Sequence, residues 1–216
     1  LMVSMPIHAE RNYDSKPVTV FGSGEDESTI AGSAQYIGDE ELKKFGYTDS
    51  ERILNRIPGV YSQTEDGFGL RTNIGMRGVS AKRSAKTNIM EDGVLQGPAQ
   101  YSNSSMYYYP TAGRMQGVEV VKGAAAIGTG PRTTAGTINY ISRQVPTAGT
   151  EGYASMTFGD DGYSRAHTYY GGNIGDIGYV VEYHDYRSDG FKTINTNGGD
   201  TGFDKQDNLF KVRYTP

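Results

Sequence analysis

The residues that could do chemistry in this sequence do not combine into a catalytic or metal-binding motif. The 216 residues include no cysteine, which excludes disulfides, thiolate metal ligands and thiol nucleophiles. His167 and His184 could face each other across one hairpin, but a third ligand is missing nearby, so a polar pair is the better interpretation. The glycine-rich stretch from Gly123 to Gly136 lacks the G-x-x-x-x-G-K-[ST] pattern of a phosphate loop. We therefore expect no enzymatic activity and no cofactor.

Composition and charge narrow the class of protein that must position these residues. The net charge of -4 argues against a polyanion-binding surface over the whole molecule, so we expect no nucleic-acid partner. The 30 glycines and 17 tyrosines favour many turns and half-buried strands. No run of about 18 apolar residues occurs, which excludes a helical membrane protein but leaves a transmembrane β-barrel open.

Residues 151–216 alternate apolar and polar side chains, which is the period of a β-strand. Pairing Phe158 with Ser164 across the first turn keeps one face free of charge, and pairing His167 with His184 places both imidazoles on the other face. That other face also holds Arg165, Glu182, Lys211 and Arg213. The apolar face carries four tyrosines: Tyr170, Tyr179, Tyr183 and Tyr214. A soluble sandwich and a barrel in lipid would both show this alternation, and the tyrosines favour the barrel.

Residues 34–146 have a different pattern, of two short helices followed by short β-like runs separated by glycine. Asp39 to Gly46 predicts a helix with acidic residues first and basic residues last. Thr48 to Glu51 predicts a capping box for a second helix, which reaches Ile57 and ends before Pro58. Asp92-Gly93 predicts a tight hairpin turn. The sequence therefore predicts a small α+β domain.

The two ends of the sequence suggest a piece of a longer protein. Residues 1–9 could be the remnant of a secretory signal peptide or a disordered tail. Residues 10–33 are polar and rich in glycine and serine, as in a linker, apart from one apolar stretch at residues 17–21. The last residues stop within an alternating segment.

At this point the order of segments resembles a known family, the TonB-dependent outer-membrane receptors. Five blocks carry the resemblance, in the family's order and approximate spacing: Ile53–Val60, Ile74–Gly78, Met90–Val94, Arg114–Gly123 and Gly136–Tyr140. The stretches from Leu54 to Val60 and from Pro110 to Pro146 look most similar to transporters of the ferric-citrate or ferric-siderophore type.

The resemblance implies an α+β plug domain followed by antiparallel β-strands of an incomplete transmembrane β-barrel, which would have about 22 strands in the full protein. The implied domains are an N-terminal tail at residues 1–33, a plug domain at residues 34–146 and the first barrel strands at residues 151–216.

The resemblance also implies roles for individual residues. In the tail it implies a TonB box, which would pair as a strand with the C-terminal domain of the TonB energy-transducing protein: Pro17, Val18, Thr19, Val20 and Phe21. Arg77 and Arg114 match plug arginines that form ion pairs with barrel glutamates, which we expect beyond residue 216.

Two plug loops, at residues 79–86 and 96–109, would touch the ligand. Their arginine, tyrosine and amide side chains suit an anionic, oxygen-rich iron chelate. The candidate ligand-binding residues are Arg83, Gln100, Tyr101, Ser102, Asn103 and Tyr107.

The resemblance therefore implies active transport of a ferric chelate across the outer membrane of a Gram-negative bacterium, with the N-terminus in the periplasm and outer-membrane lipid around the barrel. Two alternatives stay open. One is a plug-like periplasmic or surface protein that binds a ligand without transport, and the other is a receptor for cobalamin or a glycan.

Overall fold

The computed structural model describes residues 33–96, 106, 108–194 and 199–216. These residues form two compact units, one that ends at Ser142 and one that begins at Arg143. We call them the N-terminal unit and the C-terminal unit. The predicted TonB box and residues 1–9 lie outside the described residues.

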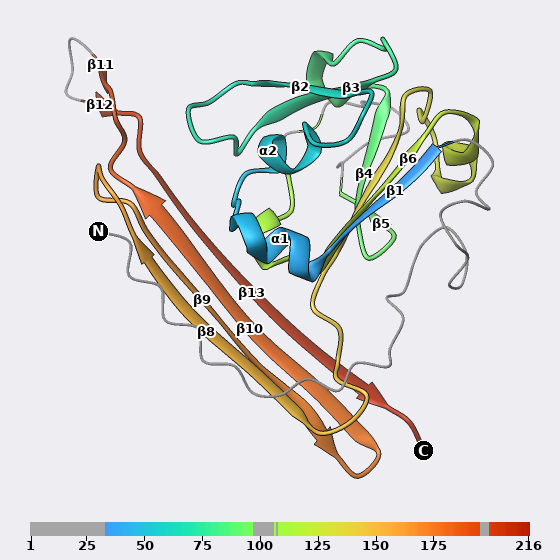
Figure 1. Ribbon diagram of the computed structural model, residues 1–216, viewed down its shortest axis with the longest axis vertical. Coiled ribbons are helices and arrows are strands. Elements are labelled where there is room, and N and C mark those ends of the chain that lie inside the picture. The colour runs from blue at the N-terminus through green and yellow to red at the C-terminus, as the bar shows by residue number, and fades with distance from the viewer. Residues whose placement is uncertain (1–32, 97–105, 107, 195–198) are drawn as a thin grey trace. The chain divides into compact units, whose positions relative to one another are not determined.

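The N-terminal unit is built on a five-stranded sheet (Figure 1). Its strands, in spatial order, are β1 (Ser33–Gly38), β6 (Gly117–Lys122), β7 (Gly136–Ile141), β4 (Thr87–Glu91) and β5 (Val94–Leu95). The central pair β4 and β7 is parallel, and the other pairs are antiparallel. A separate hairpin consists of β2 (Val60–Thr64) and β3 (Thr72–Met76). The predicted α+β architecture is confirmed.

The two faces of the five-stranded sheet differ in chemistry because side chains alternate along each strand. One face carries Val120 and Ile138 into the hydrophobic core, where they join Leu54 from the helical region. The other face is also buried and is mixed in polarity, and there Asn139 Nδ2 donates to Glu119 Oε2 at 2.9 Å beside the apolar Met90 and Val121. The hydrogen bond compensates for the burial of both polar groups.

The first helix, α1 (Asp39–Phe45), begins and ends where the sequence predicts. Gly46 terminates it in the left-handed conformation, at φ 58°, which glycine adopts without steric cost. The part of the unit that the structure describes also contains three short 3₁₀ helices: η2 (Lys82–Ser84), η3 (Ala112–Arg114) and η4 (Ala124–Thr129). Among the described residues, no helix is long and apolar enough to cross a membrane.

The prediction for the second helix is wrong in its cap and its length. Helix α2 spans Ser50–Leu54, and its N-cap is Asp49, whose carboxylate accepts a hydrogen bond from Arg52 N at 2.7 Å. The helix is therefore capped by Asp49, one residue later than the N-cap Thr48 of the predicted capping box. Ile57 lies beyond the helix but is still buried in the core.

The predicted hairpin at Asp92-Gly93 is confirmed between β4 and β5. Both residues have positive φ, 49° and 80°, as a two-residue turn of type I′ requires. The Asp92 carboxylate also accepts hydrogen bonds from Ser142 N at 3.0 Å and Ser142 Oγ at 2.5 Å. The turn is thereby tied to the last residue of the N-terminal unit.

The C-terminal unit is an antiparallel sheet of long strands (Figure 1). Its strands, in spatial order, are β13 (Phe203–Tyr214), β10 (Ile177–Ser188), β9 (Ser164–Ile174) and β8 (Thr150–Phe158). The predicted register is confirmed, because Phe158 pairs with Ser164 and His184 pairs with His167. A short hairpin of β11 (Thr193–Ile194) and β12 (Gly199–Asp200) extends from the β10–β13 connection.

The apolar face of the C-terminal sheet is the exposed face. Met156, Phe210 and Tyr214 are 60%, 68% and 68% exposed, respectively. On the opposite face Glu182 and His184 are buried, at 1% and 0% exposure. A water-soluble sheet has the reverse arrangement, so these strands are not the strands of a soluble sandwich.

Candidate functional site

The structure brings the described parts of the two predicted ligand loops together. Met106 N donates a hydrogen bond to the Arg83 carbonyl at 3.1 Å. Tyr109 Oη lies 2.6 Å from Ser84 Oγ and donates to the Thr72 carbonyl. The two loops therefore meet at the turn that follows β3. Five of the predicted ligand residues lie outside the described residues: Gln100, Tyr101, Ser102, Asn103 and Tyr107.

Arg83 lies at the tip of this turn with an exposed side chain. Its φ is 51° and that of Ser84 is 49°, so two consecutive residues adopt the uncommon left-handed conformation. The Arg83 N–H donates to Asn73 Oδ1 at 2.7 Å, which stabilises the turn. The geometry presents a guanidinium at the surface, where it can reach an anion.

Tyr109 contacts this turn from the hydrophobic core of the N-terminal unit. It is buried, and burial raises the pKa of its hydroxyl to about 12. The hydroxyl is therefore neutral and can donate a hydrogen bond at physiological pH. Its role in the loop is structural, since its ring lies in the hydrophobic core.

Arg114 is buried and has an ion-pair partner inside its own unit. Its guanidinium is 4% exposed, and Nη2 lies 2.5 Å from Oε1 of Glu91 at the end of β4. The sequence did not reveal this pair, because 23 residues separate the two side chains. The expected ion pair with a barrel glutamate stays a prediction.

Arg77 is exposed, and its backbone adopts φ 51° at the end of β3. Its guanidinium passes over Gly123, where an added Cβ would lie 2.5 Å from Nη1. Burial, and secondarily the charge of Arg77, lowers the pKa of the neighbouring Lys122. Lys122 Nζ in turn donates to the Pro58 carbonyl at 2.8 Å. The expected role of Arg77 in a barrel ion pair also stays a prediction.

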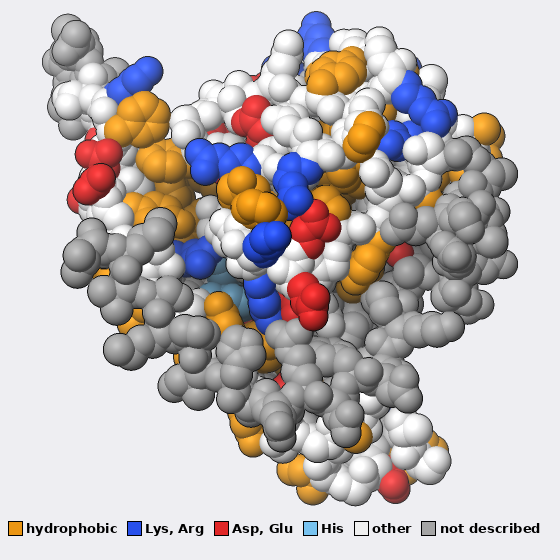
Figure 2. Space-filling model, viewed as in Figure 1, with side chains coloured by type: hydrophobic (Ala, Val, Ile, Leu, Met, Phe, Trp, Pro, Cys, Tyr) orange, Lys and Arg blue, Asp and Glu red, His pale blue; other side chains and the backbone are white. Residues whose placement is uncertain are grey.

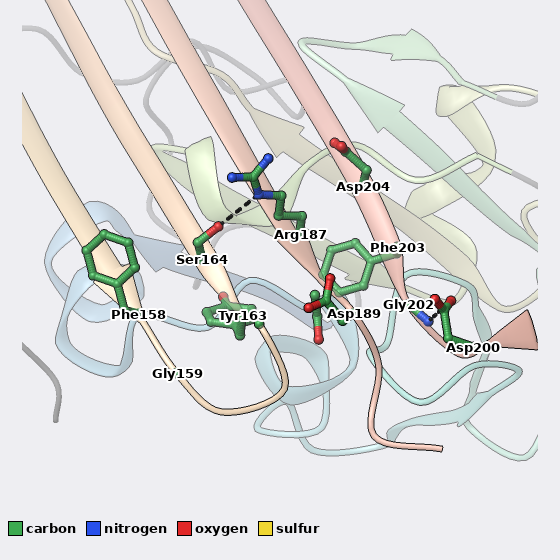
Figure 3. Close-up of a pocket in the computed structure, with 12 residues that line it drawn as sticks. Phe158, Gly159, Tyr163, Ser164, Arg187, Asp189, Asp200, Gly202, Phe203 and Asp204 are labelled. Atoms are coloured by element: carbon green, nitrogen blue, oxygen red, sulfur yellow. Dashed lines mark hydrogen bonds between the residues drawn. The ribbon is translucent and has the colours of Figure 1, made fainter. Parts of the chain in front are cut away.

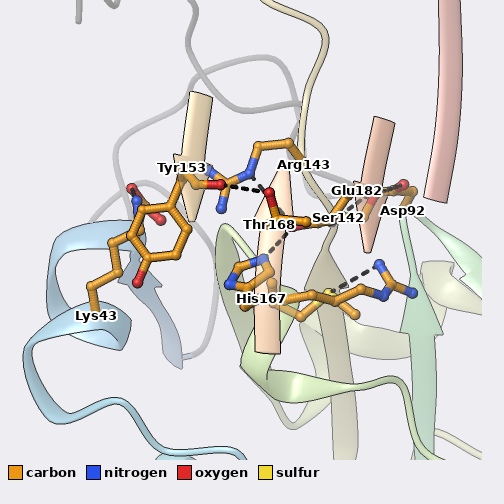
Figure 4. Close-up of polar contacts among 11 residues, drawn as sticks. Lys43, Asp92, Ser142, Arg143, Tyr153, His167, Thr168 and Glu182 are labelled. Carbon is orange, nitrogen blue, oxygen red and sulfur yellow. Dashed lines mark hydrogen bonds and ion pairs between the residues drawn. The ribbon is translucent and has the colours of Figure 1, made fainter. Parts of the chain in front are cut away.

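The buried face of the C-terminal sheet holds a second polar cluster (Figure 4). His167 Nε2 lies 2.8 Å from Glu182 Oε1, and Arg143 Nε lies 3.9 Å from the same oxygen. The Arg143 guanidinium also stacks over the Tyr169 ring at 4.1 Å. Sequence reasoning placed His167 and Glu182 on this face but missed Arg143. Its position directly after a predicted strand was the only available signal.

Aromatic rings continue this cluster along the same face. The rings of His167 and His184 are 5.2 Å apart, and His184 meets Tyr186 edge-on at 5.2 Å. Tyr153 stacks on Tyr169 at 5.5 Å. The interpretation of the two histidines as a polar pair on one face is confirmed. Within the described ranges, no group of three or more potential ligand residues could hold a metal ion.

A cavity of about 670 Å³ lies at the loop end of the same sheet (Figure 3). Phe158 and Tyr163 line it from the β8–β9 hairpin, and Arg187 donates to Ser164 Oγ at 3.2 Å. Three carboxylates also line it: Asp189, Asp200 and Asp204. The cavity is open and mixed in charge, and the sequence did not predict it.

Charged and aromatic side chains of α1 and of the region of α2 contact each other at the surface of the N-terminal unit, and Figure 2 shows basic, acidic and hydrophobic side chains side by side on one face of the molecule. Arg56 lies 4.4 Å from the Phe45 ring, and Phe45 stacks on Tyr47 at 5.5 Å. Arg52 lies 5.8 Å from the Tyr47 ring. These contacts join α1 to the region of α2 and account for the exposed Phe45.

Comparison with known proteins gives a family match in the N-terminal unit and relatives that extend over both units. The family described as TonB-dependent Receptor Plug Domain matches residues 26–137, which is 112 of 216 residues. The vitamin B12 transporter BtuB of Vibrio vulnificus is 25% identical over 213 residues, or 96% of this chain and 34% of the transporter. The chain thus spans about a third of the length of this curated relative.

Solved structures share the fold. The ferric yersiniabactin uptake receptor FyuA of Yersinia pestis matches with a TM-score of 0.71 and 24% identity over 88% of this chain and 30% of the receptor. The siderophore receptor PirA of Acinetobacter baumannii matches with a TM-score of 0.56 and 22% identity over 76% of this chain and 26% of the receptor. The ferric citrate transporter FecA matches with a TM-score of 0.51 and 23% identity over 86% of this chain and 32% of the transporter. The plug match over more than half of the chain, and the outward apolar strands that follow it, show that this chain belongs to the TonB-dependent receptors, which are not enzymes.

Proposed function

We propose that the full-length protein is a receptor of the Gram-negative outer membrane that imports a ferric chelate by TonB-dependent active transport. The observation that carries the proposal is a plug-family domain followed by a sheet whose apolar side is exposed and whose polar side is buried. Such a sheet suits a barrel with lipid outside and polar groups inside.

The lengths of the connections support a periplasmic N-terminus. Gly175 and Asp176 alone connect β9 to β10, whereas residues 189–202 connect β10 to β13. Outer-membrane barrels have short periplasmic turns and longer extracellular loops. The chain enters the sheet at Thr150, which pairs with Gly172 near the short turn. The entry point would therefore be periplasmic.

Residues 17–21 would couple the receptor to the inner membrane as a TonB box. The segment is β-branched, precedes the first strand of the plug and can pair through its main chain with a strand of TonB. Deleting Pro17–Phe21 from the full-length receptor should abolish energised uptake and leave ligand affinity unchanged. Deleting residues 22–26, which shortens the same segment equally, is the matched control. Uptake that survives the first deletion would contradict the assignment.

A ferric chelate is the substrate class that we favour. Three neighbours in fold are named as receptors or transporters for ferric yersiniabactin, siderophores and ferric citrate. The exposed guanidinium of Arg83 would attract an anionic, oxygen-rich chelate. Cobalamin is a second candidate, because the relative that aligns over 96% of this chain is named as a vitamin B12 transporter.

An equilibrium binding screen tests the substrate. The full-length receptor in outer-membrane vesicles would be titrated separately with ferric citrate, ferric enterobactin, ferric yersiniabactin and cobalamin. We expect saturable binding of one ferric chelate and its energised uptake by cells. Binding of cobalamin alone would replace the first candidate by the second. Binding without energised uptake would favour a receptor that does not transport.

A further inference from the structure

The four residues that open the C-terminal unit, Arg143–Pro146, are held by three strands of the sheet. We call them the anchor segment. Arg213 of β13 donates from Nη1 to the Val145 carbonyl at 3.3 Å and from Nη2 to the Pro146 carbonyl at 2.7 Å. Asn173 of β9 donates to the Pro146 carbonyl as well, at 2.9 Å.

The arginine and the asparagine also support each other. Arg213 Nη2 donates to Asn173 Oδ1 at 3.1 Å, so the guanidinium bridges two carbonyls of the anchor segment and one side chain of β9. A planar guanidinium can make these contacts at once, whereas an ammonium could not match their geometry.

Arg143 fixes the other end of the anchor segment. It is 1% exposed, and its guanidinium lies between the Tyr169 ring of β9, at 4.1 Å, and the Glu182 carboxylate of β10, with Nε 3.9 Å from Oε1. Glu182 is itself held by His167 at 2.8 Å. The cation therefore contacts two different strands.

Two glycines make room for the anchor segment against the sheet. A Cβ at Gly178 would lie 2.6 Å from Val145 Cγ1, and a Cβ at Gly171 would lie 3.1 Å from Pro146 Cδ. Larger residues at these positions would push the segment away from the strands. Val145 is buried as a result.

We propose that Arg213 and Arg143 are positioning residues that make the anchor segment a fixed end point for the plug. This inference rests on the proposed function, in which TonB pulls on the N-terminal segment. The pulling force would then act on the chain from the N-terminal segment up to the anchor segment, and the anchor segment would resist it. Rearrangement is thereby confined to residues before Arg143, and the connection to the strands stays in place during transport.

The first test measures the anchor without transport. In outer-membrane vesicles that contain the full-length receptor, Val145→Cys should react slowly with a soluble maleimide, because the site is buried. Adding Arg213→Ala should speed the reaction by about tenfold or more, since two charge-assisted hydrogen bonds to the segment are lost. Lys211→Ala, two residues away on the same face of β13, is the matched control and should change nothing. Equal rates in the parent and Arg213→Ala receptors would overturn the proposal.

The second test asks whether the segment stays in place during uptake. A Val145→Cys/Gly178→Cys receptor should form a disulfide, because Val145 Cγ1, which a Cβ at Gly178 would meet at 2.6 Å, is replaced by the sulfur that forms the bond. In the reduced state this receptor should transport at the parent rate, which controls for the 2.8 Å contact between the new Cβ and Asn173 Oδ1. The 216 residues contain no other cysteine. With radioactive iron supplied as ferric citrate, the oxidised receptor should transport at the parent rate. Loss of uptake on oxidation, with recovery on reduction, would overturn the proposal.

A rescue experiment separates positioning from simple stability. Arg213→Ala should lower uptake while ligand affinity is unchanged, and the disulfide should restore uptake in the oxidised but not the reduced state. A structural role of Arg213 elsewhere in the barrel would not respond to this bond. If the parent receptor takes up no ferric citrate, ferric citrate is not its substrate. The maleimide rates, which do not depend on transport, then test whether Arg213 holds the anchor segment.

Discussion

For single charged residues, the sequence predicts which face of a strand they occupy but not which distant side chains they contact. The pattern placed Glu182 and His167 on one face because strand alternation is local. It did not reveal Glu91 as the partner of Arg114, or Tyr169 as the platform of Arg143, because no local pattern marks contacts across 23 and 26 positions. The predicted ion pairs of Arg77 and Arg114 with barrel glutamates stay open, because the glutamates are expected beyond residue 216.

Tyr109 makes a testable contribution at this scale. Its pKa is raised by burial to about 12, so the folded state holds the proton that the unfolded state releases near pH 10. Its stabilising effect is therefore complete below pH 10 and is lost as the pH rises from 10 to 12. We expect Tyr109→Phe to cost about 1 kcal/mol at pH 9, from the lost hydrogen bonds. At pH 11 the parent has lost about 1.4 kcal/mol through ionisation of Tyr109 in the unfolded state, so the difference should reverse in sign and leave the variant slightly more stable.

The measurement is a urea titration of the full-length receptor in detergent. Unfolding of the N-terminal unit is followed by the reactivity of a thiol at the buried position Ala135. Tyr108→Phe is the matched control, because Tyr108 is 44% exposed. A Tyr109→Phe difference that does not depend on pH would contradict the assignment.

Among the secondary-structure elements, hairpins and strand register were predicted correctly where the turn residues and the alternation of apolar and polar residues indicate the same pairing. The hairpin at Asp92-Gly93 and the register of β8, β9 and β10 follow from short-range patterns. The parallel pairing of β4 with β7 could not be predicted in this way, since Thr87 and its partner Gly136 lie far apart in the sequence. Glycines at such crossings are needed for packing, as at Gly136, where an added Cβ would lie 2.3 Å from the Val121 carbonyl.

The cap of α2 gives a prediction at this scale. Asp49→Ala should lower the free energy of unfolding of the N-terminal unit by about 1 kcal/mol, because the Arg52 N–H loses its acceptor. Thr48→Ala should have little effect, although the capping box in the sequence would assign the larger loss to Thr48. The same urea titration compares the two variants. A larger loss for Thr48→Ala would restore the original interpretation.

At the scale of the whole molecule, the exposed apolar side of the C-terminal sheet has a slanted edge. Its last apolar residue toward the loop end of the sheet is Phe158 on β8, Tyr183 on β10 and Phe210 on β13. Phe158 pairs with Ser164 of β9 and Tyr183 with Thr168, so the end of the apolar run shifts by four residues over two strands, and it shifts by two more from β10 to β13. With about 3.3 Å per residue and about 4.8 Å between strands, the slant corresponds to a tilt of roughly 50°. Barrel strands in membranes are tilted by about 45°. A level membrane boundary across tilted strands therefore explains the slant.

Collision of spin labels with oxygen and with a nickel chelate would show whether the apolar side of the C-terminal sheet faces lipid. Single cysteines at Phe210, Val212, Leu209 and Lys211 would be labelled in the full-length receptor, reconstituted in phospholipid vesicles. We predict that labels at 210 and 212 collide with lipid-soluble oxygen and labels at 209 and 211 do not, because the two pairs lie on opposite faces of β13. The reverse alternation, or none, would contradict a sheet with its apolar side in lipid, and with it the proposed transporter.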